Sequence, residues 1–340
     1  MSNTQILLNE ALCFDDVLLE PQFSAIPHRA DVDVSSSLGD GRNQVRLSTP
    51  VIPANMDTVT SESMFYAATE AGSFGYVHRG LSPDERLSLA QRELKPGITV
   101  GISDEERELA LRLIDEGVVH ICVDVAHGDH FMMYDTVDYI KNHASADIVL
   151  CAGNVCTQGA TDALANSGAD IVKVGIGPGS VCSTRIVTGH GYPQLSAIAQ
   201  CSQVKGVQII ADGGCRNTGD ITKALAAGAD AVMSGFLFAG CSECPGQAVM
   251  NYKTGRLGYV YRGMASFKAQ AARGKKPRLP EGVSAMVEKK GPVANVISKM
   301  KEGIQSGLSY SGANNLIALR ECAQWVKITS NTVRESGTRL

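Results

Sequence analysis

The stretch GIGPGSVCSTR, residues 175–185, places one cysteine among glycines, hydroxyl side chains and an arginine. A thiol reacts as its thiolate, and positive charge together with clustered backbone N–H groups favours that form. Cys182 has Arg185 and a glycine-rich backbone beside it, and it lies in a polar loop instead of an apolar strand. The pattern therefore favours nucleophilic chemistry at Cys182, with a buried structural cysteine as the open alternative.

Two more glycine-rich loops follow, ADGGCR at residues 211–216 and SGFLFAG at 234–240. Glycine lets backbone N–H groups approach an anion closely, so three such loops together predict a phosphate site. Asp212 stands just before the glycines of its loop, where a carboxylate can accept hydrogen bonds from ribose hydroxyls. Asp124, in CVDVAHG, has a similar position. Either residue could equally be a turn or capping aspartate.

Regular elements must hold these loops, and the sequence predicts strands that alternate with helices. The expected strands cover residues 49–56, 73–78, 98–102, 119–125, 147–153, 170–177, 207–214 and 230–235. The clearest helical patterns cover residues 82–94, 104–117, 158–169 and 217–229, and the first opens on a predicted capping box of Ser82 with Glu85 three residues later. Eight such units in roughly 200 residues favour an α/β fold of the closed (β/α)8 TIM-barrel type over an open doubly wound sheet. Phosphate is commonly bound after strands seven and eight of such a barrel.

The rest of the chain predicts one catalytic domain over residues 1–340. Residues 251–291 are polar and rich in lysine and arginine, as in a mobile flap after strand eight, and a C-terminal helical segment starts at Pro292.

Composition excludes several classes of function. The net charge is −4 and the basic residues are dispersed, so we expect no nucleic-acid partner. The sequence has neither a signal-peptide pattern nor an apolar run of about 18 residues, so we expect no membrane association and a cytoplasmic location. Most of the ten cysteines, which are spread along a long chain, are expected to be reduced. Cys241 and Cys244 form a single C-x-x-C pair, from which we expect no metal site.

Several motifs, in chain order, resemble the family of IMP dehydrogenase and GMP reductase. They are FDDVLLEP, PANMDTV, AGNV, GIGPGSVCSTR, ADGG and YRGMAS, and the resemblance runs from about residue 10 to 335. It implies that Cys182 is the nucleophile that attacks C2 of a purine nucleotide, and that Thr184 and Glu281 handle protons. It also implies a homotetramer of barrels.

The same resemblance implies the binding residues. On the substrate it implies contacts from Ser180, Gly214, Gly235 and Tyr261 to the 5′-phosphate, from Asp212 to the ribose, and from Gly263, Met264 and Arg278 to the base. On the cofactor side it implies Asp124, Ala126 and Asn154. The carbonyl groups of Gly177, Gly179 and Cys182 correspond to a loop that binds a monovalent cation, K+.

Features that separate the two activities point in both directions. Dehydrogenases of the family usually carry paired CBS modules after the second strand, whereas about twenty residues separate VHRG from ITVG here, so we expect no CBS insertion. Their flap also carries an Arg-Tyr pair that activates water, and here Arg273 precedes Gly274. PANMDTV and GHGYPQLSA are similar to reductases, but RIVTG, YRGM, PEGV and VKITSNTVRES are more similar to dehydrogenases.

Because the water-activating pair is missing, we expect a GMP reductase that uses NADPH to convert GMP to IMP and ammonia. A CBS-less IMP dehydrogenase, which would need Arg273 or Lys275 to activate water, and a non-catalytic purine-nucleotide-binding paralogue are the alternatives. Ser183, Ala265 and Pro280 depart from the family pattern, so the exact purine stays open.

Overall fold

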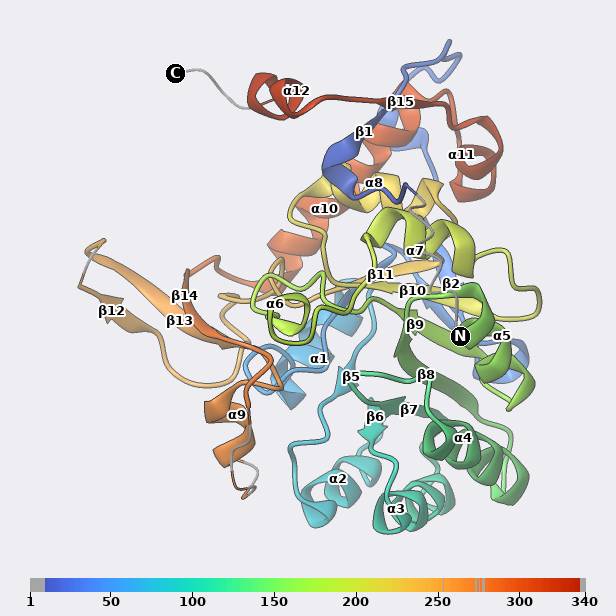
Figure 1. Cartoon of the computed structure of the whole chain (residues 1–340), viewed down its shortest axis with the longest axis vertical. Coiled ribbons are helices and arrows are strands. Elements are labelled where there is room, and N and C mark those ends of the chain that lie inside the picture. The colour runs from blue at the N-terminus through green and yellow to red at the C-terminus, as the bar shows by residue number, and fades with distance from the viewer. Residues whose placement is uncertain (1–9, 253, 273, 275, 277–278, 337–340) are drawn as a thin grey trace, which may run out of the picture.

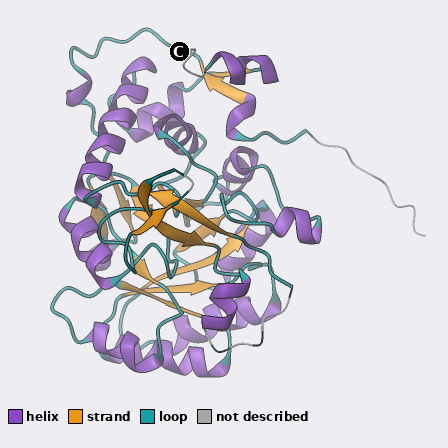
Figure 2. Ribbon diagram, turned by 90° about the vertical axis from the view of Figure 1, so that its left-hand side faces the viewer, coloured by secondary structure: helices purple, strands orange, loops and turns teal. Residues whose placement is uncertain are grey.

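The computed structural model describes residues 10–252, 254–272, 274, 276 and 279–336, and its centre is an eight-stranded parallel sheet. The strands are β4 (Val51–Pro53), β5 (Tyr76–Val77), β6 (Gly97–Val100), β7 (His120–Asp124), β8 (Val149–Val155), β9 (Ile171–Val174), β10 (Gln208–Asp212) and β11 (Ala231–Ser234). Hydrogen bonds join them in the order β4-β11-β10-β9-β8-β7-β6-β5. Helices surround the strands (Figures 1 and 2), and each predicted strand is present, which confirms the barrel.

Alternation along these short strands separates two packed layers. Side chains such as Ile121, Val172 and Val232 pack outward against the helices, whereas Ile171 and Ile210 pack with each other inside the barrel. Both sets are essentially inaccessible to water, which explains why the strands are nearly continuous apolar runs. Asp124, Lys173 and Asp212 each come two residues after an interior position of their strand. Because side chains alternate between the two faces of a strand, these three also point to the interior side of the barrel.

One or more helices follow each strand. They are α1 (Glu62–Glu70), α2 (Pro83–Ala90), α3 (Asp104–Asp115), α4 (Phe131–His143), α5 (Gln158–Asn166), α6 (Thr184–Thr188), α7 (Gln194–Cys201), α8 (Thr218–Ala226) and α10 (Val293–Tyr310). Ser82 and Glu85 form the capping box that the sequence predicts at the start of α2. Two helices, α6 and α7, follow β9 where we expected one, and the first of them carries Thr184.

The region between β11 and α10 contains regular secondary structure, although its polar sequence with weak periodicity suggests a surface loop. It contains β12 (Val249–Asn251), β13 (Arg256–Arg262), α9 (Phe267–Ala272) and β14 (Ser284–Glu288), and the three strands form an antiparallel sheet. This sheet projects from the barrel on the left in Figure 1. We call residues 251–291 the flap. Its mobility is still a prediction.

Segments near the two ends of the chain pack around the barrel. Near the N-terminus, β1 (Val17–Leu19) pairs with β15 (Trp325–Lys327), and α11 (Leu316–Cys322) and α12 (Ser330–Glu335) flank β15 in sequence. The hairpin of β2 (Ser36–Leu38) and β3 (Val45–Leu47) buries Leu38 and Leu47 against the barrel interior. Short 3-10 turns span Phe14–Asp16, Arg29–Asp31 and Gly41–Asn43. Among the described helices, none combines the length and the apolar character that a membrane span requires.

Candidate active site

A cavity of about 410 Å³ opens where the strands of the barrel end, and the loops after β4, β7, β8, β9, β10 and β11 contribute to its wall. The predicted site residues that line it are Asp124, Ala126, Asn154, Gly177, Gly179, Ser180, Cys182, Thr184, Asp212, Gly214, Gly235, Tyr261, Gly263, Met264 and Glu281. Arg278 lies outside the described residues, as do Arg273 and Lys275. The structure thus gathers the predicted residues around one cavity, and their individual roles remain predictions.

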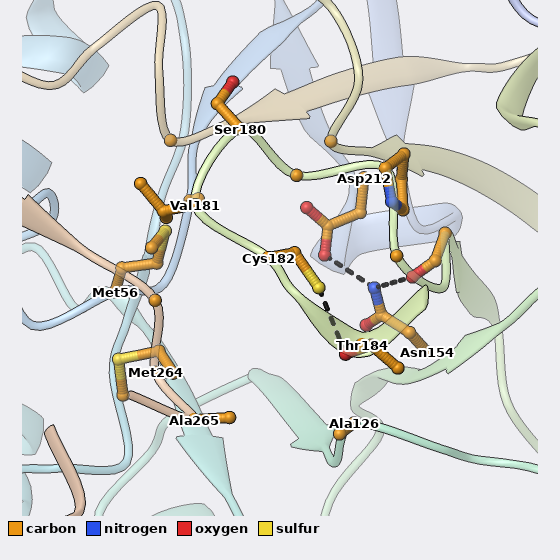
Figure 3. A pocket seen from close by; sticks show the side chains of 18 of the residues that line it. Met56, Ala126, Asn154, Ser180, Val181, Cys182, Thr184, Asp212, Met264 and Ala265 are labelled. Atoms are coloured by element: carbon orange, nitrogen blue, oxygen red, sulfur yellow. Dashed lines mark hydrogen bonds between the residues drawn. The ribbon is translucent and has the colours of Figure 1, made fainter. Parts of the chain in front are cut away.

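The loop after β9 presents the cysteine. Its fold depends on glycine at Gly175, because a Cβ there would lie 2.1 Å from the carbonyl oxygen of Asp212. The N–H of Cys182 donates to the carbonyl of Gly179 at 2.9 Å and closes a tight turn. The half-buried Cys182 thiol donates to Thr184 Oγ1 at 3.1 Å, as Figure 3 shows. The expected nucleophile and one expected proton carrier are therefore in direct contact.

The flap brings Glu281 to the same place from about a hundred residues along the chain. The N–H of Ser183 donates to the carbonyl of Glu281 at 3.0 Å, and that of Val283 donates to the carbonyl of Val181 at 2.9 Å. A bridge between Cys182 and Gly282 continues this pairing. The base of the flap is therefore hydrogen-bonded to the cysteine loop, and Glu281 lines the cavity beside Cys182 and Thr184.

Asn154 connects the cysteine loop to the predicted ribose carboxylate. Its side-chain N–H groups donate to Asp212 Oδ2 and to the carbonyl of Gly175, both at 2.9 Å (Figure 3). Its Oδ1 atom is buried and has no hydrogen-bond partner within the part of the chain that the structure describes. A ligand amide could donate to this oxygen, since buried polar atoms are rarely left unpaired.

Lys173 is a site residue that the sequence motifs did not indicate. Its side chain is about 2% exposed, and its ammonium lies 2.5 Å from Asp124 Oδ1 and 3.1 Å from Asp212 Oδ2. Burial opposes the charged form, but the two carboxylates outweigh it and raise the pKa of Lys173 well above its usual value. Burial likewise opposes ionisation of Asp124, yet Lys173 and then Arg79 keep the pKa of that carboxyl below its usual value. A lysine inside the apolar run DIVKVGIG was the available signal.

The wall of the cavity that faces Asp212 and Asn154 carries sulfur and aromatic groups. Met56 and Met264 lie on one side of Cys182, and Asp212 and Asn154 lie on the other (Figure 3). Burial raises the pKa of Tyr261, so its phenol stays protonated and able to donate a hydrogen bond.

An ion pair anchors this wall to the barrel. Arg262, at the end of β13, pairs with Asp57 in the loop after β4 at 2.6 Å. The backbone N–H of Asp57 also lies 3.3 Å from the sulfur of Met264. Strand β13, which carries Tyr261, and Met264 shortly after it are therefore tied to the first barrel loop.

Known proteins share this architecture and sequence. A family model described as "IMP dehydrogenase / GMP reductase domain" matches residues 11–339. The IMP dehydrogenase of Aquifex aeolicus is 32% identical over 97% of this chain and 95% of its own length. The GMP reductase of Bacillus subtilis is 37% identical over 90% of this chain and 93% of its own length.

The solved structures give the same result. A cysteine-to-alanine variant of GMP reductase from Trypanosoma brucei, in complex with guanosine 5′-monophosphate, superposes with a TM-score of 0.90 and 27% identity, covering 99% of each chain. With the barrel, the cavity and these matches taken together, the chain belongs to the IMP dehydrogenase and GMP reductase family, whose members are oxidoreductases that use a nicotinamide cofactor.

Proposed function

We propose that the protein is a GMP reductase, which converts GMP to IMP and ammonia with NADPH. The contact between Cys182 and Thr184, with Glu281 on the same cavity wall, is the observation that carries this proposal. These groups can form and release a purine adduct and move protons, whereas hydrolysis of that adduct needs a further group that activates water. The Arg-Tyr pair that performs this step in dehydrogenases is absent from the sequence of the flap.

In the proposed reaction, the sulfur of Cys182 forms a bond to C2 of the purine. Thr184 and Glu281 deliver the proton that the 2-amino group needs to leave as ammonia. When bound, the reduced nicotinamide supplies a hydride to the same carbon. The C–S bond then breaks, which releases IMP and restores the cysteine.

The cavity offers groups that suit both ligands. The unpaired Oδ1 of Asn154 can accept a hydrogen bond from the carboxamide of the nicotinamide, on the side where Asp124 and Ala126 line the wall. Asp212 would accept hydrogen bonds from the ribose of GMP. Ser180, Gly214, Gly235 and Tyr261 would hold its phosphate, since a protonated phenol and backbone N–H groups are suitable donors to an anion.

We also propose a cation site and an assembly. The carbonyl groups of Gly177, Gly179 and Cys182 would hold K+. Among the described residues the Gly179 carbonyl accepts one backbone hydrogen bond, from Cys182, and a carbonyl oxygen has two lone pairs. Turnover in K+ compared with Li+ tests the cation, and light scattering of the protein tests the homotetramer.

The dehydrogenase activity is the second candidate, because IMP dehydrogenases as well as GMP reductases are among the relatives of the chain. Absorbance of the reduced nicotinamide distinguishes the two directions. We expect absorbance to fall with GMP and NADPH, with one ammonia released for each cofactor oxidised. Growth of absorbance with IMP and NAD, and no change with GMP, would replace the proposal with the dehydrogenase. Tight binding of GMP without turnover in either direction would indicate a non-catalytic paralogue.

A further inference from the structure

Lys173 lines the cavity, and residues from three other parts of the barrel lie around its ammonium group. It projects from β9, and its ammonium contacts Asp124 at the end of β7 and Asp212 at the end of β10. Asn55, after β4, places its Oδ1 atom 3.4 Å from the same nitrogen. One buried cation therefore connects residues at the ends of β4, β7 and β10, three strands that are not adjacent to one another in the sheet, and no step of the proposed reaction uses it.

The two carboxylates face different ligands in the proposed function. Asp212 is expected at the ribose of the nucleotide, and Asp124 is expected on the nicotinamide side. Without a cation between them, two carboxylates at one buried site would repel each other, and one of them would take up a proton. The titratable and charged groups that face Lys173 are Asp124, Asp212, Cys122 and Cys151, and Arg79 acts on Asp124 from the loop after β5.

We propose that Lys173 is a positioning residue that fixes the ribose carboxylate Asp212 and the nicotinamide-side carboxylate Asp124 in one arrangement, and so aligns the nucleotide with the cofactor. This inference rests on the proposed function, because it uses the roles assigned there to both aspartates. Lys173 touches neither ligand in this account. Its two ion pairs hold one oxygen of each carboxylate beside the same nitrogen, at 2.5 Å for Asp124 and 3.1 Å for Asp212.

Room around Lys173 is limited, which makes its position well defined. A Cβ on Gly153, in the adjacent strand β8, would lie 2.6 Å from the Lys173 carbonyl oxygen and 2.7 Å from its Cβ. The stem of the lysine is therefore packed against a glycine at the point where β8 and β9 pair. Any side chain at position 153 would therefore displace the backbone and stem of Lys173.

The test measures the affinity for GMP by calorimetry from pH 6.0 to 8.5, together with the KM for NADPH. Lys173→Met keeps the length of the side chain and removes its charge, and Lys173→Arg restores the charge. Lys141→Met is the matched control, since Lys141 pairs with Asp170 at 2.8 Å away from the cavity lining. The Kd of each variant is divided by that of the unchanged protein at the same pH, which cancels titration of the phosphate.

In Lys173→Met one aspartate is expected to take up a proton more readily, because each carboxylate disfavours the charged form of the other. The Kd ratio should therefore be several-fold larger at pH 6.0 than at pH 8.5, and the KM for NADPH should rise at least about tenfold. Lys173→Arg should recover most of both losses, and Lys141→Met should leave both unchanged. A ratio for Lys173→Met that is flat across this range, or Lys173→Arg no better than Lys173→Met, would overturn the proposal.

A double variant keeps the proposal testable if Lys173→Met does not fold. Lys173→Met with Asp124→Asn removes one charge of each sign, so its Kd ratio for GMP should no longer depend on pH, while its KM for NADPH should stay raised. An unchanged KM for NADPH would overturn the proposal. Calorimetry with GMP does not require turnover, so a failure of the proposed reductase reaction would be seen separately, as binding without NADPH oxidation.

Discussion

Gly235 lies at the end of β11, where the cavity wall leaves no room for a side chain. A Cβ at this position would lie 2.5 Å from the Tyr261 hydroxyl and 2.7 Å from the sulfur of Met56, whereas ordinary contacts begin at 3.4 Å. Its φ angle is outside the left-handed region that favours glycine, so Gly235→Ala introduces a steric change without backbone strain. Both neighbours would have to move by roughly 1 Å.

The expected loss follows from overpacking. An extra methyl group in a filled site costs about 1–3 kcal/mol. If Tyr261 and Met56 yield by moving into the cavity, that energy is lost from nucleotide binding, and the affinity for GMP falls by about 5- to 150-fold. If they yield elsewhere, the energy is lost from stability, and the melting temperature falls while the affinity is retained.

Calorimetry with GMP and a thermal melt separate these two results. Gly159→Ala is the matched control, because a Cβ on Gly159 in α5 would have no atom within 4 Å. It should keep the affinity and leave stability equal or slightly higher. Gly235→Ala with an affinity within twofold of the unchanged protein and an unchanged melting temperature would refute the view that this glycine, Tyr261 and Met56 form one packed wall of the nucleotide site.

Three further predictions concern other residues. Thr184→Val removes the oxygen that accepts the Cys182 thiol proton. In a steady-state assay, kcat should therefore fall by about 10²- to 10⁴-fold, while the affinity for GMP stays within a few fold. Thr184→Ser keeps the hydroxyl group and should retain activity in the same assay. Burial lowers the pKa of His120 to about 4, below its value in the unfolded chain, so the unfolded chain binds more protons between pH 6.5 and 4. The free energy of unfolding should therefore fall by up to roughly 3 kcal/mol as the pH is lowered from 6.5 to 4. Urea unfolding should show a smaller fall for His120→Phe over the same pH range, and equal falls in the two proteins would contradict this prediction. Asp57→Asn should destabilise the protein by about 1–3 kcal/mol, because the Asp57 and Arg262 side chains are only 13% and 21% exposed. A double-mutant cycle with Arg262→Met that gives no coupling energy would contradict this prediction, because the pair would then contribute as little as an exposed salt bridge.

The barrel could be predicted because its signals are local. Each strand of a sheet that is buried on both faces must be apolar on both faces, and each helix must show its own amphipathic period. The capping pattern at Ser82 depends on four consecutive residues, and the structure confirms it. The rule that barrel sites lie at the carboxyl ends of the strands then placed Cys182, Asp212 and Asp124 around one cavity.

Other features depend on contacts between distant segments. Pairing of β1 with β15 joins the two ends of the chain, and no local pattern indicates it. Glu281 reaches the cysteine loop through backbone hydrogen bonds, which place no demand on side-chain type. The antiparallel strands of the flap were hidden because RLGYVYR mixes charged, glycine and aromatic residues at positions that alternate only weakly.

Lys173 shows the value of a residue that breaks its local rule. A lysine in a strand buried on both faces is costly unless it is paired, so its presence in DIVKVGIG predicts buried carboxylates nearby. The sequence could not say which acidic residues these are, because Asp124 and Asp212 come from strands on either side of it in the chain. Only the pairing of β7, β8, β9 and β10 in one sheet brings all three together.

In the proposed function, Cys182 carries the chemistry of GMP reduction. The most direct test of this role measures NADPH oxidation and ammonia release with GMP, for the unchanged protein and for Cys182→Ala, together with GMP affinity by calorimetry. We predict one ammonia for each NADPH in the unchanged protein, and no detectable turnover in Cys182→Ala with GMP still bound. Turnover by Cys182→Ala at the full rate would contradict the claim.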